Sequence, residues 1–141
     1  MKISQNQIQF NVNNTILISR LIEGQFPNYQ KVIPTEHTKK LIIPTEQLTH
    51  SVKRAEIVAR ENSHRMLVAT EEGRLLITAE SGGIGRVHEE VEVIKEGDEV
   101  KMAFNAKYLI DVLSVVDAEA IEVELSGEVS PALILLSLIH I

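Results

Sequence analysis

The sequence predicts an α+β domain in which two helices pack on antiparallel sheet, and three observations support this fold class. Several segments alternate apolar and polar residues with a period of two, as half-buried strands do. Two segments instead carry apolar residues at steps of three and four, as amphipathic helices do. The order of the segments repeats, because Pro44 and Leu48 match Asn105 and Leu109 at a common offset of 61 residues. We therefore expect two copies of a strand–helix–strand–strand(–strand) unit, with the helices on one face of the sheet.

The chain begins with a predicted β-hairpin. Residues 7–12 and 15–19 both alternate, and Asn13-Asn14 between them fits a tight turn because asparagine tolerates positive φ. Residues 24–40 are polar and contain Pro27 and Pro34, which interrupt regular structure. This stretch is expected to connect two units of the chain.

The first repeat starts with a predicted strand over residues 40–43, followed by a helix over residues 45–61. Thr45 is expected to cap this helix. Ser51 and Arg54 are expected on its solvent face. The buried face is formed by apolar residues at helical spacing, namely Leu48, Val52, Ala55 and Ala59.

The strands that follow are separated by turn signals. A hairpin is predicted from residues 65–70 and 74–80, with Glu71-Glu72-Gly73 at its turn, and a further strand covers residues 89–94. The second repeat then follows the same order. It has strands at residues 100–104, 120–125 and from 132 onward, and a helix over 105–116 that Asn105 caps.

Composition excludes several classes of protein. The 141 residues include 14 Lys+Arg and 20 Asp+Glu, a formal charge of −6, and 44% are hydrophobic, which is enough for a buried core. The absence of cysteine excludes disulfides, thiol nucleophiles and zinc–thiolate sites. No apolar run approaches the ~18–20 residues of a membrane span, and the N-terminus lacks the apolar stretch of a secretory signal. We expect a soluble, cytoplasmic protein.

The usual signatures of catalysis or metal binding are missing. None of the five histidines lies three or four residues from another, so no helical metal pair is expected, and we predict no cofactor. The glycine-rich segment 82–86 leads into a strand and not into a helix, so it lacks the amide array of a phosphate site. Alternation places Glu89 and Glu90 on opposite faces of their strand, which argues against a paired-carboxylate site. Nothing in these patterns indicates an enzyme, and an alternative function as an enzyme would need residues that the sequence does not supply as a motif.

The first helix is the least acidic part of the chain. Residues 45–65 carry a net charge of +1, whereas the remaining residues sum to −7. A solvated helix face and a surface that contacts an anionic partner both fit this pattern.

Three segments of the chain carry specific motifs. They are Ser19-Arg20-Leu21-Ile22-Glu23-Gly24-Gln25-Phe26-Pro27-Asn28-Tyr29 with Val32-Ile33-Pro34, then Phe104-Asn105-Ala106-Lys107-Tyr108-Leu109-Ile110-Asp111-Val112-Leu113, and Val129-Ser130-Pro131-Ala132-Leu133-Ile134. In this order, over residues 3–134, they resemble the bacterial sliding-clamp family, the beta subunit of the replicative DNA polymerase III. The resemblance implies a DNA-clamp fold built from β-α-β-β-β repeats.

The resemblance also implies that the chain is a C-terminal fragment of a clamp. Residues 1–29 resemble the end of the middle domain, and residues 30–134 resemble the third domain. Residues 135–141 depart from the family's ending, so we expect a non-native apolar tail without a partner strand.

The family's full-length protein is a head-to-tail homodimeric ring that encircles double-stranded DNA and slides on it as a processivity factor. A closed ring retains DNA by topology, so an acidic chain with a near-neutral helical lining is compatible with this function. The resemblance implies that the two helices line the hole. The candidate phosphate contacts are Lys53, Arg54, Arg60 and Lys107. The region of this chain that matches the family's subunit contact contains Ile57, Val58, Glu89 and Glu92.

Clamps of this family also bind partners through an apolar pocket between the second and third domains. The pocket captures short hydrophobic motifs of the DNA polymerase III alpha subunit, the clamp loader and repair proteins. Lys31 stands where an arginine is common in the family. The matching positions in this chain are Pro27, Lys31, Val32, Asn105, Tyr108, Val129 and Pro131.

Two other functions remain open from the residues alone. One is an α+β enzyme or small-ligand domain that shares only the repeat, which would need a convergent polar pocket. The other is a generic interaction domain with no role at DNA.

Overall fold

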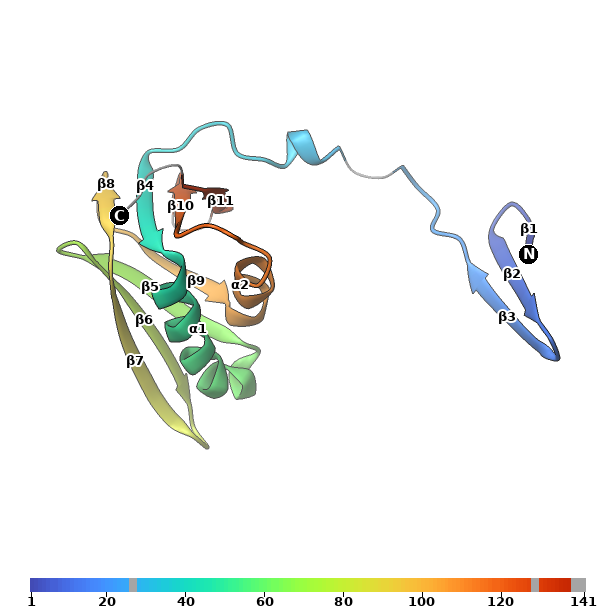
Figure 1. Cartoon of the computed structure of the whole chain (residues 1–141), viewed down its shortest axis with the longest axis horizontal. Coiled ribbons are helices and arrows are strands. Elements are labelled where there is room, and N and C mark those ends of the chain that lie inside the picture. Colours follow the sequence, from blue (N-terminus) through green and yellow to red (C-terminus); the bar gives the residue numbers. More distant parts are fainter. Residues whose placement is uncertain (26–27, 128–129, 138–141) are drawn as a thin grey trace. The chain divides into compact units, whose positions relative to one another are not determined.

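The computed structural model describes residues 1–25, 28–127 and 130–137, and it divides the chain into two compact units (Figure 1). The first unit is Met1–Val32 and the second is Ile33–Ile141. Within the described ranges, no helix is long and apolar enough to cross a membrane.

The first unit contains a three-stranded antiparallel sheet in the order β1-β2-β3, with β1 at Lys2–Ile3, β2 at Gln7–Val12 and β3 at Thr15–Arg20. Asn13 has a φ of 52°, which confirms the predicted hairpin turn. A 3₁₀ turn, η1, covers Tyr29–Lys31. Several apolar side chains of the hairpin are more than half exposed, among them Val12, Ile16 and Leu17. Among the described residues of this unit, no second layer therefore covers these side chains.

The second unit has two four-stranded sheets and two helices, which confirms the predicted α+β class (Figure 1). The sheets have the strand orders β11-β10-β4-β8 and β7-β6-β5-β9, and the neighbouring strands of the described residues pair antiparallel. The elements are β4 (Lys39–Pro44), α1 (Thr45–Ala59), η2 (Arg60–Asn62), β5 (Arg65–Glu71), β6 (Arg74–Ser81), β7 (Gly85–Glu92), β8 (Ile94–Glu96), β9 (Lys101–Asn105), α2 (Ala106–Leu113), β10 (Ala120–Leu125) and β11 (Leu133–Leu136).

The two repeats exchange their first strands. β4 precedes α1 but pairs with β10 of the second repeat, where Leu41 lies opposite Val123. β9 precedes α2 but pairs with β5 of the first repeat, where Asn105 lies opposite Arg65. Each sheet is therefore built from both repeats.

The first backbone amide of each helix also donates a hydrogen bond to the other repeat. The N–H of Thr45 donates to the carbonyl of Glu119 at 2.9 Å, just before β10. The N–H of Ala106 donates to the carbonyl of His64 at 2.8 Å, just before β5. Thr45 and Ala106 are 61 residues apart, so these equivalent bonds support the predicted internal repeat.

The core lies between the helices and the sheets. α1 packs against α2 and against β5, β6 and β7. The predicted inward residues of α1 are all buried, and Leu109 of α2 packs against the same core. The largest side chains that are fully buried belong to Leu48, Met66, Ile77, Ile121, Val52 and Val91.

A cavity of about 40 Å³ lies within this core. Its lining is apolar apart from Thr70, whose hydroxyl accepts a hydrogen bond from the N–H of Val100 at 2.8 Å. A water molecule needs two to four polar partners, so this cavity is expected to be dry. Leu48, Leu109 and Val123 are among the side chains that line it.

Several details differ from the sequence predictions. Thr45 does not cap α1, because Pro44 occupies the N-cap position and the buried Oγ1 of Thr45 has no hydrogen-bond partner in the described structure. The predicted strand over residues 89–94 is broken at Val93, where the chain passes from β7 in one sheet to β8 in the other. The predicted helix over 105–116 begins one residue later and ends at Leu113.

The expectation of a tail without a partner strand was wrong for Leu135 and Leu136. Both belong to β11 and lie opposite Glu122 and Ile121 of β10. Residues 138–141 lie outside the described part of the chain.

Candidate functional site

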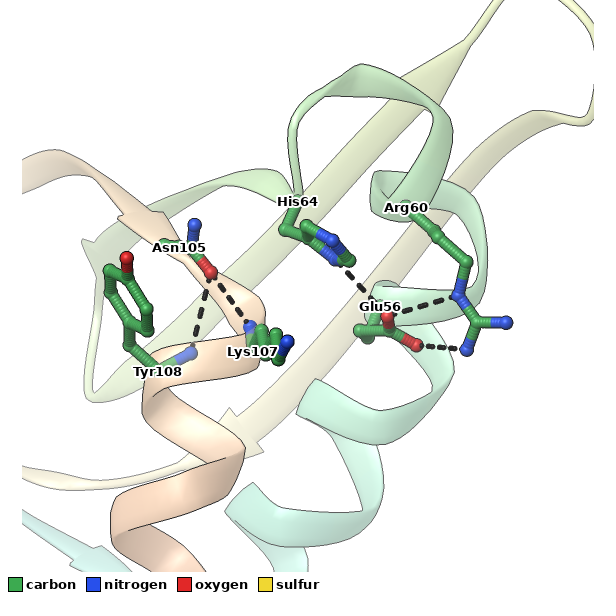
Figure 2. A network of polar contacts seen from close by, with 6 residues as sticks. All are labelled: Glu56, Arg60, His64, Asn105, Lys107 and Tyr108. Carbon is green, nitrogen blue, oxygen red and sulfur yellow. Dashed lines mark hydrogen bonds and ion pairs between the residues drawn. The ribbon is translucent and has the colours of Figure 1, made fainter. Parts of the chain in front are cut away.

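The N-terminal turn of α2 carries two of the predicted partner-binding residues. Asn105 is the N-cap, and its side-chain oxygen accepts hydrogen bonds from the backbone N–H of Lys107 at 3.0 Å and of Tyr108 at 3.3 Å (Figure 2). This confirms the predicted cap and fixes the start of the helix. Tyr108 is 70% exposed, so its ring and hydroxyl are available to a ligand.

The other predicted partner-binding residues are spread over the two units. Lys31 and Val32 are exposed in the first unit, and Pro131 is exposed in the second. Pro27 and Val129 lie outside the described residues. The structure thus brings Asn105 and Tyr108 together at one helix end.

The predicted DNA-facing cations differ in their surroundings. Arg54 forms a two-pronged ion pair with Glu89 of β7, with Nε 2.8 Å from Oε1 and Nη2 2.5 Å from Oε2. Arg60 forms a similar pair with Glu56, one helical turn earlier. Lys53 and Lys107 are exposed, and neither takes part in an ion pair within the described part of the chain.

The prediction that Ser51 and Arg54 occupy the solvent face of α1 was wrong for Ser51 and is confirmed for Arg54, whose side chain is 54% exposed. Ser51 is only 3% exposed, and its hydroxyl lies 3.3 Å from Oε2 of Glu89. The face of α1 that carries both residues packs beside β7, so a carboxylate 35 residues further along the chain pairs with Arg54. This carboxylate has a lowered pKa, chiefly because it accepts hydrogen bonds from the Arg54 guanidinium.

The predicted subunit-contact residues divide into surface and core. Ile57 is 58% exposed, whereas Val58 is 8% exposed and belongs to the core, so Val58 presents no surface here. Glu92 is exposed, and Glu89 is held by Arg54. The sheet order places β7 at an edge, and Glu90 pairs with Arg74 and His88 on the face opposite Glu89, as the alternation predicts.

A polar network that the sequence did not predict lies beside the start of α2. Glu56 pairs with both Arg60 and His64, and its side chain is only 13% exposed (Figure 2). The pKa of Glu56 is lowered, mainly by the hydrogen bond from Arg60 and to a smaller extent by His64. The four-residue spacing of Glu56 and Arg60 is a signal that sequence reasoning could have used.

The glycine-rich turn is unsuited to phosphate. The N–H groups of Gly83 and Ile84 donate to the hydroxyl of Ser81, which in turn donates to the carboxylate of Glu61 at 2.5 Å. The amides are therefore occupied, and a negative charge lies beside them. Among the described residues, no group of three or more His, Asp or Glu side chains could hold a metal ion.

Comparison with known proteins identifies relatives over almost the whole chain. Residues 30–136 match the family described as DNA polymerase III beta subunit, C-terminal domain. The beta sliding clamp of Staphylococcus aureus is 35% identical over 130 residues, which cover 91% of this chain and 34% of that protein. The chain thus spans about a third of the length of the curated relatives that it matches.

Solved structures agree in fold. The DNA polymerase III beta subunit of Thermotoga maritima matches with a TM-score of 0.78 and 30% identity, over 98% of this chain and 38% of that one. The Pseudomonas aeruginosa sliding clamp bound to griselimycin matches with a TM-score of 0.77 and 29% identity, over 96% of this chain and 37% of that one.

Proposed function

The chain belongs to the family of the DNA polymerase III beta subunit, C-terminal domain, and we propose on this basis that it is the C-terminal third of a sliding clamp. In this proposal it is a non-catalytic part of a processivity factor for the replicative DNA polymerase. The observation that carries the proposal is the match of residues 30–136 to the family. Residues 1–29 would then be the remnant of the middle domain, and the third domain, expected over residues 30–134, would extend to Leu136 because the family match includes Leu135 and Leu136.

We call the full-length clamp that would contain this chain the parent clamp. A primer-extension assay with the parent clamp tests the proposed function. The parent clamp, loaded on primed circular DNA, should lengthen the product made in one polymerase binding event. An unchanged product length would leave an interaction domain or a small-ligand domain as the better explanation.

In the proposed ring, α1 and α2 face the DNA duplex. A ring that holds DNA by threading needs only weak phosphate contacts, since strong ones would impede sliding. Of the four candidate phosphate contacts, Arg54 and Arg60 are already paired with Glu89 and Glu56. The charges of Lys53 and Lys107 have no carboxylate partner among the described residues, so these two lysines are the better candidates.

The DNA contact is tested by reversing charge at these two lysines in the parent clamp. Lys53→Glu with Lys107→Glu should shorten the residence time of the clamp on nicked circular DNA. Lys101→Glu on β9 is a matched control. If the wild type, the double variant and the control variant had equal residence times, neither Lys53 nor Lys107 would contact DNA.

The partner pocket is proposed to use Asn105, Tyr108, Val129 and Pro131 of the second unit. The roles of Pro27, Lys31 and Val32 of the first unit stay predictions. Tyr108 supports this proposal because it is an exposed aromatic side chain at a capped helix start. We infer that griselimycin, to which the Pseudomonas aeruginosa clamp is bound, occupies this pocket.

Tyr108→Ala in the parent clamp should weaken griselimycin binding by ~1–3 kcal/mol if Tyr108 is an energetic anchor. Isothermal titration measures this change. Val115→Ala, at an exposed apolar residue beyond α2, should leave the affinity unchanged. Equal affinities for the two variants would exclude Tyr108 from the pocket.

The subunit contact is proposed to use Ile57, Glu89 and Glu92 around the edge strand β7, with Val58 supporting it from the core. A head-to-tail contact needs a complementary surface from another domain. Sedimentation should therefore show that Ile57→Asp dissociates the dimeric parent clamp, whereas Val115→Asp does not.

A further inference from the structure

His64 contacts both helices of the second unit. Its ring Nδ1 lies 3.2 Å from Oε1 of Glu56 on α1, and its backbone carbonyl accepts the N–H of Ala106, the first residue of α2, at 2.8 Å. The neutral ring can donate from Nδ1 to the carboxylate, so the contact needs no protonation. One residue therefore joins the last turn of α1 to the first turn of α2 (Figure 2).

The backbone at this point is held in an uncommon conformation. Ser63 and His64 have φ values of 52° and 58°, so two successive residues other than glycine adopt the left-handed region. Such residues carry a conformational cost and persist where surrounding contacts determine them. At His64 these contacts are the Glu56 carboxylate and the Ala106 amide.

Glu56 is itself held in place. Arg60 donates to both of its oxygens, from Nε at 3.2 Å and from Nη2 at 2.9 Å. The carboxylate is mostly buried, with 13% of the side chain exposed. It is therefore a fixed acceptor for the His64 ring.

His64 is also connected to the site at the start of α2. Ala106 lies directly between Asn105, which caps the helix, and Lys107, whose N–H the cap binds. Arg65, the residue after His64, lies opposite Asn105 in the β5–β9 ladder. The position of Asn105 and Tyr108 relative to α1 thus depends on the conformation of His64.

We propose that His64, oriented by Glu56, is the positioning residue for the ligand-binding turn formed by Asn105 and Tyr108. This inference rests on the proposed function, in which that turn contacts a partner. His64 acts through the Ala106 amide and does not itself contact the ligand.

The first arm of the test measures amide hydrogen exchange in the 141-residue chain. His64→Ala keeps the backbone carbonyl that binds Ala106 but removes the ring's hydrogen bond to Glu56. Loss of this one bond should let the carbonyl leave the Ala106 amide more often and speed exchange of that amide about tenfold, while the Val52 amide in the middle of α1 is unchanged. His64→Asn should restore slow exchange, because asparagine tolerates the left-handed conformation and carries an N–H donor. His88→Ala removes another histidine–glutamate contact and should have no effect on Ala106.

Exchange at Ala106 that is as slow in His64→Ala as in the wild type would overturn the proposal. If His64→Ala does not fold, Glu56→Leu serves in its place, since it removes the acceptor of the ring and keeps the backbone unchanged. The same increase is expected at Ala106.

The second arm measures griselimycin affinity of the parent clamp. His64→Ala should weaken binding about tenfold, and His64→Asn should recover most of the loss. If Tyr108→Ala weakens binding but His64→Ala does not, the positioning role is wrong and the proposed pocket stands. If Tyr108→Ala leaves the affinity unchanged, the proposed pocket is wrong and the positioning role fails with it.

Discussion

Arg54 and Glu89 join the middle of α1 to the edge strand β7 through two parallel hydrogen bonds, of 2.8 and 2.5 Å. The neighbouring hydroxyl of Ser51 contacts both partners, at 3.2 Å from Nη2 of Arg54 and 3.3 Å from Oε2 of Glu89. A bidentate arrangement of this kind adds geometric specificity to the attraction between the charges. It fixes the edge strand against the helix.

Arg54→Ala should therefore lower the thermal midpoint of unfolding, because it leaves the Glu89 carboxylate beside α1 without its main donor. Lys53→Ala is the matched control, since Lys53 is adjacent, exposed and outside every ion pair of the described residues. Calorimetry measures both midpoints. Equal midpoints would show that the pair contributes nothing to stability.

Stability should fall in acid. The pKa values of Glu56 and Glu89 are lowered in the folded chain, by the hydrogen bonds from Arg60 and Arg54 respectively. The unfolded chain then binds more protons than the folded chain near the ordinary glutamate pKa, so the free energy of unfolding decreases as the pH falls through that range, from about 5.5 downward.

Urea denaturation at several pH values measures this slope. The double variant Glu56→Gln/Glu89→Gln should show a flatter dependence on pH than the wild type. A slope that stays as steep in the double variant would assign the acid sensitivity to other groups.

Gly97 should not tolerate a side chain. Its φ is +90°, and a Cβ added there would lie 2.6 Å from the carbonyl oxygen of Thr38 just before β4. Gly97→Ala is expected to destabilise the second unit by ~1–3 kcal/mol, the cost of a strained backbone position. Gly82→Ala has open space around it and serves as the control. Urea titration of both variants gives the difference, and equal stabilities would contradict the close approach.

The internal cavity offers a route to higher stability. Val123 of β10 lines this space of about 40 Å³, and Val123→Ile adds one methylene group to an apolar wall. Filling a cavity without strain commonly stabilises a protein by ~0.5–2 kcal/mol. Val115→Ile, at a residue that is 82% exposed, should be neutral. Destabilisation by Val123→Ile would mean that the cavity cannot accept the group without displacing its neighbours.

Local features of the fold could be predicted because they depend on neighbouring residues. The offset of 61 residues aligned Pro44 with Asn105, and both prove to be N-cap residues of helices. The turn at Glu72 and Gly73 was predictable from its residue types, and the structure gives φ values of 46° and 81° there. These signals act within a few residues, so a single sequence contains them.

Features that depend on distant segments could not be predicted in this way. The exchange of β4 and β9 between the sheets leaves no local pattern. The ion pair of Arg54 depends on a strand 35 residues away, so helical spacing alone placed its side chain in solvent but could not predict its partner Glu89. Glu56 and His64 are eight residues apart and meet only because the chain turns through Ser63 in the left-handed region.

The pairing of β4 with a strand of the second repeat also affects when the chain can fold during its synthesis. Leu41 of β4 pairs with Val123 of β10, so the sheet that contains both cannot close until 82 further residues have been synthesised. During translation, the first repeat emerges from the ribosome with its opening strand unpaired on that side. Folding of this unit is then expected as a single late event, once the second repeat has left the exit tunnel, and not as two successive steps.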